Sequence, residues 1–403
     1  MKWLEGKRII LGVTGGISAY RACDIIRNLT QERAEVNVVM TKAASEFITS
    51  LTMQTLSQNP VITELFNLIS ESHIGHISLA QGADLFIVAP CTANCIGKLA
   101  NGVADDMLTT LYLATEAPVA LAPAMNEKMW AHSAVQANVK ILKSRGVTFI
   151  DPEWGELACG DVGLGRLANI DKIVETVICE LFPNTLENVR VLVTAGPTVE
   201  PIDPVREVTN RSSGKMGFAL ARVARRLGAQ VTLVSGPVAL DDPWFVNTVR
   251  VRTAIEMHRA VLDHVKGMDV VLKAAAVADF RPKGVGKKKI KKEGFPEAID
   301  MEKNVDILEK LGALNPRPYL VGFAAETDDM RKNALAKMKR KNIDAIAAND
   351  VSRSDIGFSS DQNEVNLYFA GGEEVSLPRG EKMDVAFNIL NEVGKKIRKG
   401  TDG

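Results

Sequence analysis

Short apolar runs rich in β-branched residues alternate with helical patterns along the first half of the chain. The runs predict strands at 8–13, 36–40, 84–89, 117–122 and 147–150. The segments between them place apolar residues at helical spacing, and this alternation predicts a parallel sheet covered by helices on both faces. Ligands of such sheets bind at the carboxyl ends of the strands, where the connecting loops lie.

The same alternation begins again in the middle of the chain. The apolar run 189–194 ends in the turn residues Ala195-Gly196-Pro197, and a helical pattern starts near Gly214. Further patterns predict strands at 230–235, 269–279, 318–323 and 344–347, and helices at 254–265 and 384–397. The chain is therefore predicted to form two α/β domains, each a Rossmann-like, three-layer structure with a mostly parallel sheet, over residues 1–184 and 185–403.

Composition limits the partners of the protein. The chain has 403 residues with 46% hydrophobic content, enough for two cores, and its formal net charge of zero gives no general attraction to nucleic acid or anionic membranes. No apolar run reaches the roughly 20 residues that span a bilayer, and the N-terminus lacks a signal-peptide pattern. The five scattered cysteines suit the reducing cytoplasm, where we expect the protein, and Cys91 and Cys95 lack the second ligand pair of a zinc site.

Small and hydroxyl-bearing residues follow the predicted strands of the first domain. Gly15, Gly16 and Ser18 follow the first strand, Thr41 ends the second, and Thr92 follows the third. Free backbone amides and hydroxyls at helix N-termini bind phosphate. The loops lack both Gly-x-Gly-x-x-Gly and Gly-Lys-Ser/Thr, so a small mononucleotide such as a flavin phosphate fits better than a dinucleotide or ATP. Ordinary glycine turns of an α/β sheet are the alternative interpretation.

Three further groups in the first domain are candidates for chemistry. His76 opens a predicted helix, where a histidine is either structural or catalytic. Asn126 closes the segment Pro-Ala-Met-Asn at a predicted strand end, the expected ligand edge. Cys159 lies among three glycines, in a loop that either closes over a ligand or exposes a stray thiol.

In combination these groups resemble the flavoprotein cysteine decarboxylases. The order and spacing of His76, of Asn126 with Met129-Trp130, and of the Ala-Cys159-Gly-Asp-x-Gly-x-Gly-Arg loop match over most of residues 7–180. The resemblance implies that His76 serves oxidation and decarboxylation, that Asn126 binds the substrate carboxylate, and that Cys159 donates a proton. It also implies a flavodoxin-like half that binds FMN through four residues: Gly15, Ser18, Thr41 and Thr92.

Two clusters of positive charge stand out in the second half. Residues 283–292 carry six lysines, and residues 331–341 carry six further cations. Such runs are either solvated surface or, where they converge, a means of neutralising a triphosphate. Binding to RNA is not favoured, because no aromatic residues interleave the lysines to form stacking platforms.

The motifs of the second half resemble phosphopantothenate–cysteine ligase over nearly all of residues 188–400. They are Thr194-Ala-Gly-Pro-Thr198, Asp203-Pro-Val-Arg206, Thr209-Asn-Arg-Ser-Ser-Gly-Lys-Met-Gly217, Ala275-Ala-Val-Ala-Asp279, Lys289-Ile-Lys-Lys292 and Phe323-Ala-Ala-Glu-Thr327. A ligase half fused after a flavin decarboxylase half resembles the bacterial bifunctional proteins of coenzyme A biosynthesis.

The resemblance implies a ligase whose partners are 4′-phosphopantothenate, L-cysteine and CTP. CTP would activate the carboxylate as an acyl-cytidylate, Asn210 would hold this intermediate, and Lys289 would neutralise phosphate. Mg²⁺ is expected with the triphosphate, bound largely through phosphate and water, so no metal-ligating residue is identified. Val305 stands where relatives commonly have proline, which concerns only the rigidity of its loop. The implied contacts to CTP are Lys273, Ala274, Ala275, Asp279, Lys289, Asn304, Val305, Asp306, Ile307, Phe323, Lys337 and Lys341.

Two other functions remain as alternatives. One is a nicotinamide or flavin oxidoreductase unrelated to coenzyme A, which would need a dinucleotide fingerprint that neither glycine loop provides. The other is a non-catalytic flavin-binding regulatory protein, a role for which the catalytic residues would be unnecessary. The family resemblance further implies a homo-oligomer, a dodecamer. From the charge, the aromatic content and the apolar runs of the sequence, we expect no nucleic-acid and no membrane partner.

Overall fold

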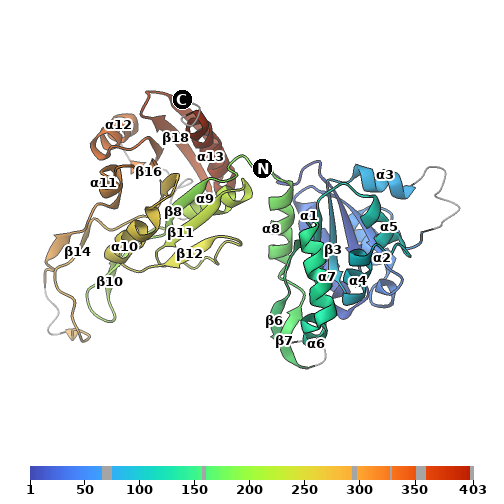
Figure 1. The fold of residues 1–403 in the computed structure, drawn as a ribbon. Coiled ribbons are helices and arrows are strands. Elements are labelled where there is room, and N and C mark those ends of the chain that lie inside the picture. The colour runs from blue at the N-terminus through green and yellow to red at the C-terminus, as the bar shows by residue number, and fades with distance from the viewer. Residues whose placement is uncertain (66–74, 157–159, 293–296, 327–328, 351–359, 400–403) are drawn as a thin grey trace. The chain divides into compact units, whose positions relative to one another are not determined.

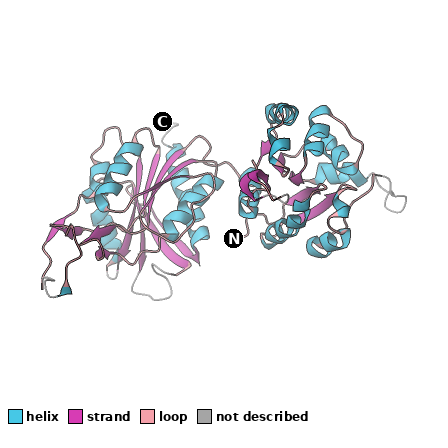
Figure 2. Ribbon diagram, turned by 90° about the horizontal axis from the view of Figure 1, so that it is seen from below, coloured by secondary structure: helices cyan, strands magenta, loops and turns pink. Residues whose placement is uncertain are grey.

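The chain separates into two compact units, Lys2–Phe182 and Pro183–Gly403, each with its own sheet (Figure 1). The computed structural model describes residues 1–65, 75–156, 160–292, 297–326, 329–350 and 360–399. Helices cover both faces of the sheet in each unit (Figure 2). The prediction of two three-layer α/β structures is confirmed.

The N-terminal sheet has five parallel strands in the order β2-β1-β3-β4-β5. They are β1 (Arg8–Val13), β2 (Glu35–Met40), β3 (Leu85–Cys91), β4 (Val119–Pro123) and β5 (Thr148–Phe149). Ile9 pairs with Val36 of β2 on one side and with Leu85 of β3 on the other, so β1 is an interior strand with a partner on each side. This is the flavodoxin-like order, whose direction reverses between β1 and β3, and such a switch point is where these sheets bind ligands.

Apolar faces of the helices explain how they cover this sheet. One face is packed by α3 (Gly75–Gly82), α4 (Ala93–Asn101), α5 (Met107–Ala114) and α7 (Ser133–Ser144), whose buried side chains form a single core with Phe86, Val88 and Leu121. Helices α1 (Ala22–Gln31) and α8 (Ile170–Leu181) pack against each other on the sheet's other face. Side-chain caps start several of the helices: Thr92 caps α4, for example, and Asp106 forms a capping box before α5.

The C-terminal sheet has eight strands in the order β12-β11-β8-β13-β16-β17-β18-β19. The first six are parallel and, numbered along the chain, follow the Rossmann order 3-2-1-4-5-6. The switch point lies between β8 and β13. The last two run antiparallel and extend the sheet at one edge. The strands are β8 (Arg190–Ala195), β11 (Gln230–Ser235), β12 (Asn247–Arg250), β13 (Val270–Lys273), β16 (Tyr319–Glu326), β17 (Ala345–Asp350), β18 (Gln362–Phe369) and β19 (Glu374–Glu381).

Two groups of helices enclose this second sheet. Helices α9 (Lys215–Arg226) and α13 (Lys382–Lys399) pack against each other on one face. The other face carries α10 (Ala254–Val265), α11 (Ile307–Gly312) and α12 (Met330–Lys341), whose buried side chains join one core with Leu192, Val271 and Leu320. Among the described residues, no helix is both long enough and apolar enough to span a bilayer.

One predicted strand is wrong in its length. The apolar run 269–279 reads as one strand, but β13 ends at Lys273. Beyond it, the Ala275 amide donates to the Thr194 hydroxyl over 3.2 Å, and the Ala276 amide donates to the Gly196 carbonyl over 2.9 Å. The backbone therefore leaves the sheet at this point and crosses toward the loop that follows β8.

Three short hairpins were not predicted from the sequence. Each lies beside a loop that carries a candidate site residue. They are β6 (Glu153–Glu156) with β7 (Val162–Arg166), β9 (Val199–Pro201) with β10 (Glu207–Thr209), and β14 (Phe280–Pro282) with β15 (Met301–Lys303).

The contact between α9 and β8 generates a stability prediction. A Cβ atom at Gly217 would lie 2.5 Å from the Ala195 Cβ, so the glycine sets how closely the helix approaches the strand. Gly217→Ala should destabilise the C-terminal unit by about 1–3 kcal/mol, the usual range for overpacking. Hydrogen exchange should then show lost protection in α9 and β8 and unchanged protection in residues 2–182.

Gly371→Ala is the matched control, since nothing lies within 4 Å of its added atom. An equal effect in both variants would contradict the prediction.

Candidate functional site

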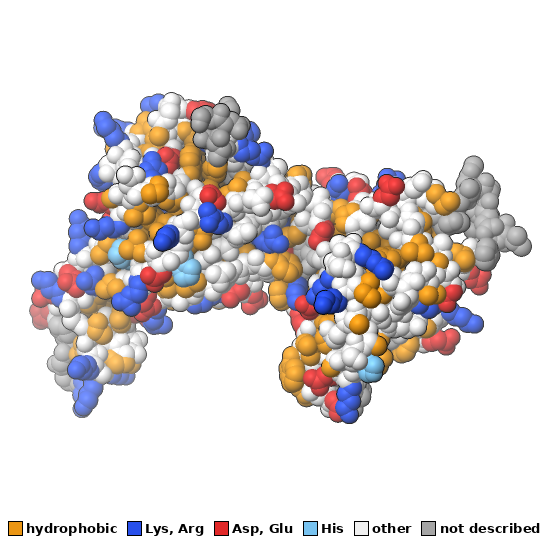
Figure 3. All heavy atoms as spheres, viewed as in Figure 1, with side chains coloured by type: hydrophobic (Ala, Val, Ile, Leu, Met, Phe, Trp, Pro, Cys, Tyr) orange, Lys and Arg blue, Asp and Glu red, His pale blue; other side chains and the backbone are white. Residues whose placement is uncertain are grey.

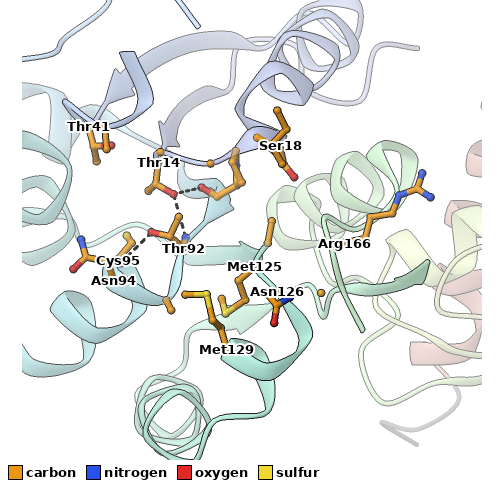
Figure 4. Close-up of a pocket in the computed structure, with 18 of the residues that line it drawn as sticks. Thr14, Ser18, Thr41, Thr92, Asn94, Cys95, Met125, Asn126, Met129 and Arg166 are labelled. Atoms are coloured by element: carbon orange, nitrogen blue, oxygen red, sulfur yellow. Dashed lines mark hydrogen bonds between the residues drawn. The ribbon is translucent and has the colours of Figure 1, made fainter. Parts of the chain in front are cut away.

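In the N-terminal unit, a cavity of about 1200 Å³ lies at the carboxyl ends of the sheet's strands (Figure 4). Residues from the loops after β1, β2, β3 and β4 line it, as the topology requires of a doubly wound sheet. It brings together the four residues predicted to bind FMN and the predicted carboxylate ligand Asn126. Its lining includes Thr14, Gly15, Gly16, Ser18, Thr41, Thr92, Asn94 and Asn126.

A buried hydroxyl joins two of these loops. Thr14 follows β1, and its Oγ1 donates to the Pro90 carbonyl over 2.8 Å and accepts from the Thr92 amide over 3.1 Å (Figure 4). Thr92 in turn caps α4, since its Oγ1 accepts from the Cys95 amide over 3.3 Å. The positive end of the α4 dipole therefore lies at the cavity wall, where it favours an anion.

Gly15 allows the loops after β1 and β2 to touch. A Cβ atom at Gly15 would lie 2.5 Å from the Ala43 Cβ and 2.7 Å from the Ala43 carbonyl oxygen. Thr41 begins the second of these loops, and its amide donates to the Val13 carbonyl over 3.1 Å. The glycine is thus required by close backbone approach, which brings the predicted phosphate-binding segment Gly15–Ser18 against the cavity floor.

Asn126 is fixed at the opposite side of the cavity lining, beside Met125 and Met129 (Figure 4). It caps the short helix α6 (Glu127–Ala131), because its Oδ1 accepts from the Lys128 amide over 2.9 Å. This bond orients the side chain and assigns its NH₂ group as the donor. An oriented amide donor suits a carboxylate ligand.

The β6–β7 hairpin docks at the cavity through its backbone. The Met125 amide donates to the Gly165 carbonyl over 3.0 Å, and a Cβ atom at Gly165 would lie 2.1 Å from the Met125 oxygen. The hairpin's own side chains Trp154 and Val162 are 66% and 59% exposed, so they do not hold it in place. Its connecting loop contains Cys159, which lies outside the described residues, but Glu156 and Gly160 on either side line the cavity.

Not every predicted residue of the first half is described. His76 lies in α3, but its side chain is outside the described set. Sequence reasoning also missed cavity residues, namely Lys98 and Asp106. Lys98 contacts Asp105 over 2.6 Å and Asp106 over 3.2 Å, and these carboxylates raise the pKa of Lys98. Lys98 lies in α4 and Asp106 lies directly before α5. Neither residue follows a strand, so a search for ligand residues at strand ends does not find them.

A second candidate site lies at the carboxyl ends of the C-terminal strands, where lysines from separate elements converge. Lys273 Nζ, at the end of β13, donates to the Ala275 carbonyl over 3.2 Å, and Lys337 Nζ of α12 donates to the Phe323 carbonyl over 3.1 Å. Lys341 of the same helix pairs with Asp306. Burial, followed by the positive charge of Lys337, lowers the pKa of Lys273 to about 8. Such a group of ammonium ions favours a polyanion.

The predicted nucleotide loop 304–307 is held next to this cluster. The Asn304 amide donates to the Asp279 carbonyl over 2.8 Å, and its side-chain Nδ2 donates to the Ala278 carbonyl over 2.9 Å. Asp306 caps α11 by accepting from the Glu309 amide over 3.1 Å, and Ile307 is buried in the core. These anchors on both sides of Val305 hold the loop although position 305 is not a proline.

The two predicted catalytic residues of this half lie on different hairpins. Asn210 follows β10, and its Nδ2 donates to the Ala276 carbonyl over 3.0 Å, beside the end of β13. Lys289 lies between β14 and β15, where Lys and Arg side chains gather on the surface (Figure 3). Its side chain is exposed and, within the described part of the chain, no contact joins it to Lys273, Lys337 or Lys341.

The chain thus carries two doubly wound α/β units, the first with a polar cavity at its switch point and the second with a lysine cluster at the carboxyl ends of its strands. Comparison with known families assigns each unit. Residues 2–182 match the Flavoprotein family, and residues 186–397 match the family described as DNA/pantothenate metabolism flavoprotein C-terminal domain.

Full-length relatives connect the two units. The coenzyme A biosynthesis bifunctional protein of Vibrio vulnificus is 47% identical over 398 residues, which cover 98% of each chain. Those of Bacillus subtilis and Escherichia coli are 48% and 46% identical, with 97% of each chain covered in both cases. The chain therefore belongs to the family of bifunctional coenzyme A biosynthesis proteins, as its motifs predicted.

Solved structures resemble single units of the chain. The C-terminal domain of a coenzyme A biosynthesis bifunctional protein is 44% identical, covering 54% of this chain and 99% of its own, with a TM-score of 0.47. A mutant PPC decarboxylase complexed with pantothenoylaminoethenethiol is 31% identical, covering 42% and 96%, with a TM-score of 0.39.

Proposed function

We propose that the chain converts 4′-phosphopantothenate into 4′-phosphopantetheine in two steps, ligation in the C-terminal unit and decarboxylation in the N-terminal unit. The observation that carries this proposal is the 46–48% identity to bifunctional coenzyme A biosynthesis proteins along almost the whole of both chains. Membership of that family decides against an unrelated oxidoreductase and against a purely regulatory protein.

The ligase step begins with activation of a carboxylate, because a carboxylate oxygen is a poor leaving group. The carboxylate of 4′-phosphopantothenate attacks the α-phosphate of CTP, pyrophosphate leaves, and an acyl-cytidylate forms. Lys273, Lys337 and Lys341 supply positive charge for the phosphates, and Mg²⁺ accompanies CTP through phosphate oxygens. The α-amine of cysteine then displaces CMP while Asn210, fixed on Ala276, holds the intermediate.

Recognition of the cytidine is assigned to the loops around the same lysines. We assign the base and ribose to residues 274–279 and to the loop 304–307, because hydrogen bonds from Asn304 to the Ala278 and Asp279 carbonyls join these two segments. Phe323 lies within β16, where it is partly buried and its carbonyl accepts from Lys337 Nζ, and its ring provides an apolar surface beside that lysine. Preference for CTP over other triphosphates is part of the proposal.

The N-terminal cavity fits FMN. Its volume suits a flavin mononucleotide, and the Gly15–Ser18 segment with the α4 N-terminus gives the phosphate a site without a competing carboxylate among these residues. When bound, FMN would accept a hydride from the substrate and later return it. Tyr20 and Ile17, also at the cavity, are more than half exposed, which is consistent with the predicted homo-oligomer covering this edge.

The residues of the chain then hold the substrate and move its protons. Oxidation of the cysteinyl thiol to a thioaldehyde places an electron sink beside the carboxylate, and loss of CO₂ leaves an enethiol. Asn126 donates its oriented amide hydrogens to the carboxylate, and His76 serves this oxidative half. Return of the hydride, with a proton from the Cys159 thiol, gives 4′-phosphopantetheine.

Mass spectrometry of one reaction mixture tests both steps. Purified, FMN-loaded protein with 4′-phosphopantothenate, cysteine, CTP and Mg²⁺ should give 4′-phosphopantetheine, CMP and pyrophosphate. Accumulation of 4′-phosphopantothenoylcysteine would retain the ligase step and contradict the decarboxylase step. Formation of neither product by the folded protein would contradict the whole proposal.

Substitution at Cys159 separates the two halves of the decarboxylase reaction. Cys159→Ser should still oxidise and decarboxylate 4′-phosphopantothenoylcysteine but should accumulate the enethiol, because the proton donor for reduction is lost. Flavin absorbance, which bleaches when the cofactor remains reduced, and product mass are the two measurements. Normal release of 4′-phosphopantetheine by this variant would contradict the role of Cys159.

The lowered pKa of Lys273 predicts proton uptake when CTP binds. At about pH 8.5 most Lys273 side chains are neutral, and the triphosphate raises their pKa again, so binding should take up protons. At about pH 6.5 the amine is already charged, and with Mg²⁺ present the uptake should vanish. Calorimetry in two buffers of different ionisation enthalpy measures this quantity. Lys273→Arg, which stays charged, should bind CTP without uptake, and unchanged uptake in that variant would contradict the assignment.

A further inference from the structure

The motif Asp203-Pro-Val-Arg206 has no role in the chemistry described above. It forms the turn of the β9–β10 hairpin, and the side chain of Asp203 is completely buried there. Carboxylates are rarely buried unless their oxygens accept several hydrogen bonds. The partners of Asp203 therefore indicate what the residue does.

The two carboxylate oxygens of Asp203 have different partners. Oδ1 accepts from the amides of Val205 and Arg206, each over 2.8 Å, and so shapes the turn itself. Oδ2 accepts from Arg206 Nη1 over 2.9 Å and from the amide of Ile290 over 3.2 Å. Only the second oxygen reaches outside the hairpin, to a residue 87 positions along the chain.

Ile290 is held at both of its backbone groups. Its amide donates to Asp203, and its carbonyl accepts from Arg206 Nη1 over 3.2 Å. A third bond, from the Gly286 amide to the Ile202 carbonyl over 2.9 Å, joins the same two segments. The lysine-rich segment is thus docked on the hairpin through its backbone, so that its side chains are left for other contacts.

The charge on Asp203 is maintained by the same contacts. Burial alone would raise its pKa, but the amides of Val205, Arg206 and Ile290, with the Arg206 guanidinium, outweigh burial and lower the pKa. The carboxylate stays ionised under neutral conditions, so Oδ2 remains an acceptor for both Ile290 and Arg206.

We propose that Asp203 is a positioning residue of the ligase reaction, which acts through Ile290 to place Lys289. The inference rests on the proposed ligase function and on the phosphate-neutralising role that the family resemblance implies for Lys289. An exposed lysine on an unanchored loop would sample many positions, whereas fixing the backbone of the adjacent Ile290 restricts the positions that the Lys289 side chain can reach.

The two half-reactions should respond differently to loss of this anchor. Asn210 follows the same hairpin, but it has its own bond to Ala276, and the Thr209 hydroxyl donates to the Thr198 carbonyl over 2.9 Å. The anchor at Asp203 is therefore required for the step that uses Lys289, formation of the acyl-cytidylate. The later reaction of the acyl-cytidylate with cysteine uses Asn210, and it should depend little on the anchor at Asp203.

Asp203→Asn tests the proposal, because it retains the Oδ1 acceptor and replaces Oδ2 by an amide donor. That donor would face the Ile290 amide and the Arg206 guanidinium, which are donors themselves. Pyrophosphate release from CTP and 4′-phosphopantothenate should fall about 10- to 100-fold, the scale of a small misplacement. The single-turnover reaction of preformed acyl-cytidylate with cysteine should change by no more than about threefold.

A double-mutant cycle with Lys289→Gln distinguishes positioning from general stability. If Asp203 acts through Lys289, then Asp203→Asn should cause no further loss of the first half-reaction in the Lys289→Gln background. An undiminished additional loss would overturn the proposal. Retained ligation by Lys289→Gln alone would overturn the proposed role of Lys289 as well, so the two failures are distinguishable.

The chain offers a matched control at the amino ends of the strands, away from the carboxyl ends that carry the candidate site. Asp344 pairs with Arg317, and its Oδ2 accepts from the Leu320 amide over 2.8 Å, at the amino ends of β16 and β17. Asp344→Asn breaks the same kinds of bond away from the site, and it should leave pyrophosphate release within about threefold of the parent.

Two measurements on the same preparation report folding. Hydrogen exchange in Asp203→Asn should rise in residues 283–292 and stay unchanged in β8 and α9. Decarboxylation of 4′-phosphopantothenoylcysteine by the N-terminal unit should keep its parent rate. Loss of protection throughout the C-terminal unit would identify Asp203 as a general structural residue and overturn the proposal, as would pyrophosphate release at the parent rate.

Discussion

Both units depend on a buried threonine hydroxyl at the end of a central strand. Thr14 follows β1 and Thr194 lies in β8, and each accepts a hydrogen bond from a backbone amide beyond the neighbouring strand across the switch point. The neighbouring strands diverge there, which leaves room for a ligand but also leaves backbone amides without ladder partners. One hydroxyl satisfies such an amide in each unit and fixes the distance between the two loops, so the rest of each site is built on it.

Much of the fold could be predicted because buried parallel strands have an unmistakable pattern. The runs 8–13 and 230–235 match β1 and β11 residue for residue, since all but the first residue of each strand is buried. The strand predicted over 269–279 was too long, because the apolar sequence continues through the alanines after β13. In the structure the Ala275 amide donates to the Thr194 hydroxyl, and the backbone leaves the sheet there. The hairpins were missed because their strands have only three to five residues, too few to show an alternating pattern.

The candidate site was predictable where topology alone places residues together. Gly15, Thr41 and Thr92 follow successive parallel strands, so their meeting at one edge needs no knowledge of side-chain contacts. The bond between Asp203 and Ile290 could not be predicted, because its acceptor and donor are far apart in sequence and the donor is a backbone amide, which every residue except proline has. The same holds for the lowered pKa of Lys273, which arises from burial of the amine and from the positive charges of Lys337 and Lys341 in α12.

The way the β6–β7 hairpin is attached has a consequence for how the protein can be re-engineered. Gly165 meets Met125 backbone to backbone, with no space for even a methyl group, while Trp154 and Val162 extend into solvent. The position of the hairpin is therefore independent of its outward side chains. Libraries that randomise these two residues should sample new side chains at an intact fold, provided that the glycine is kept.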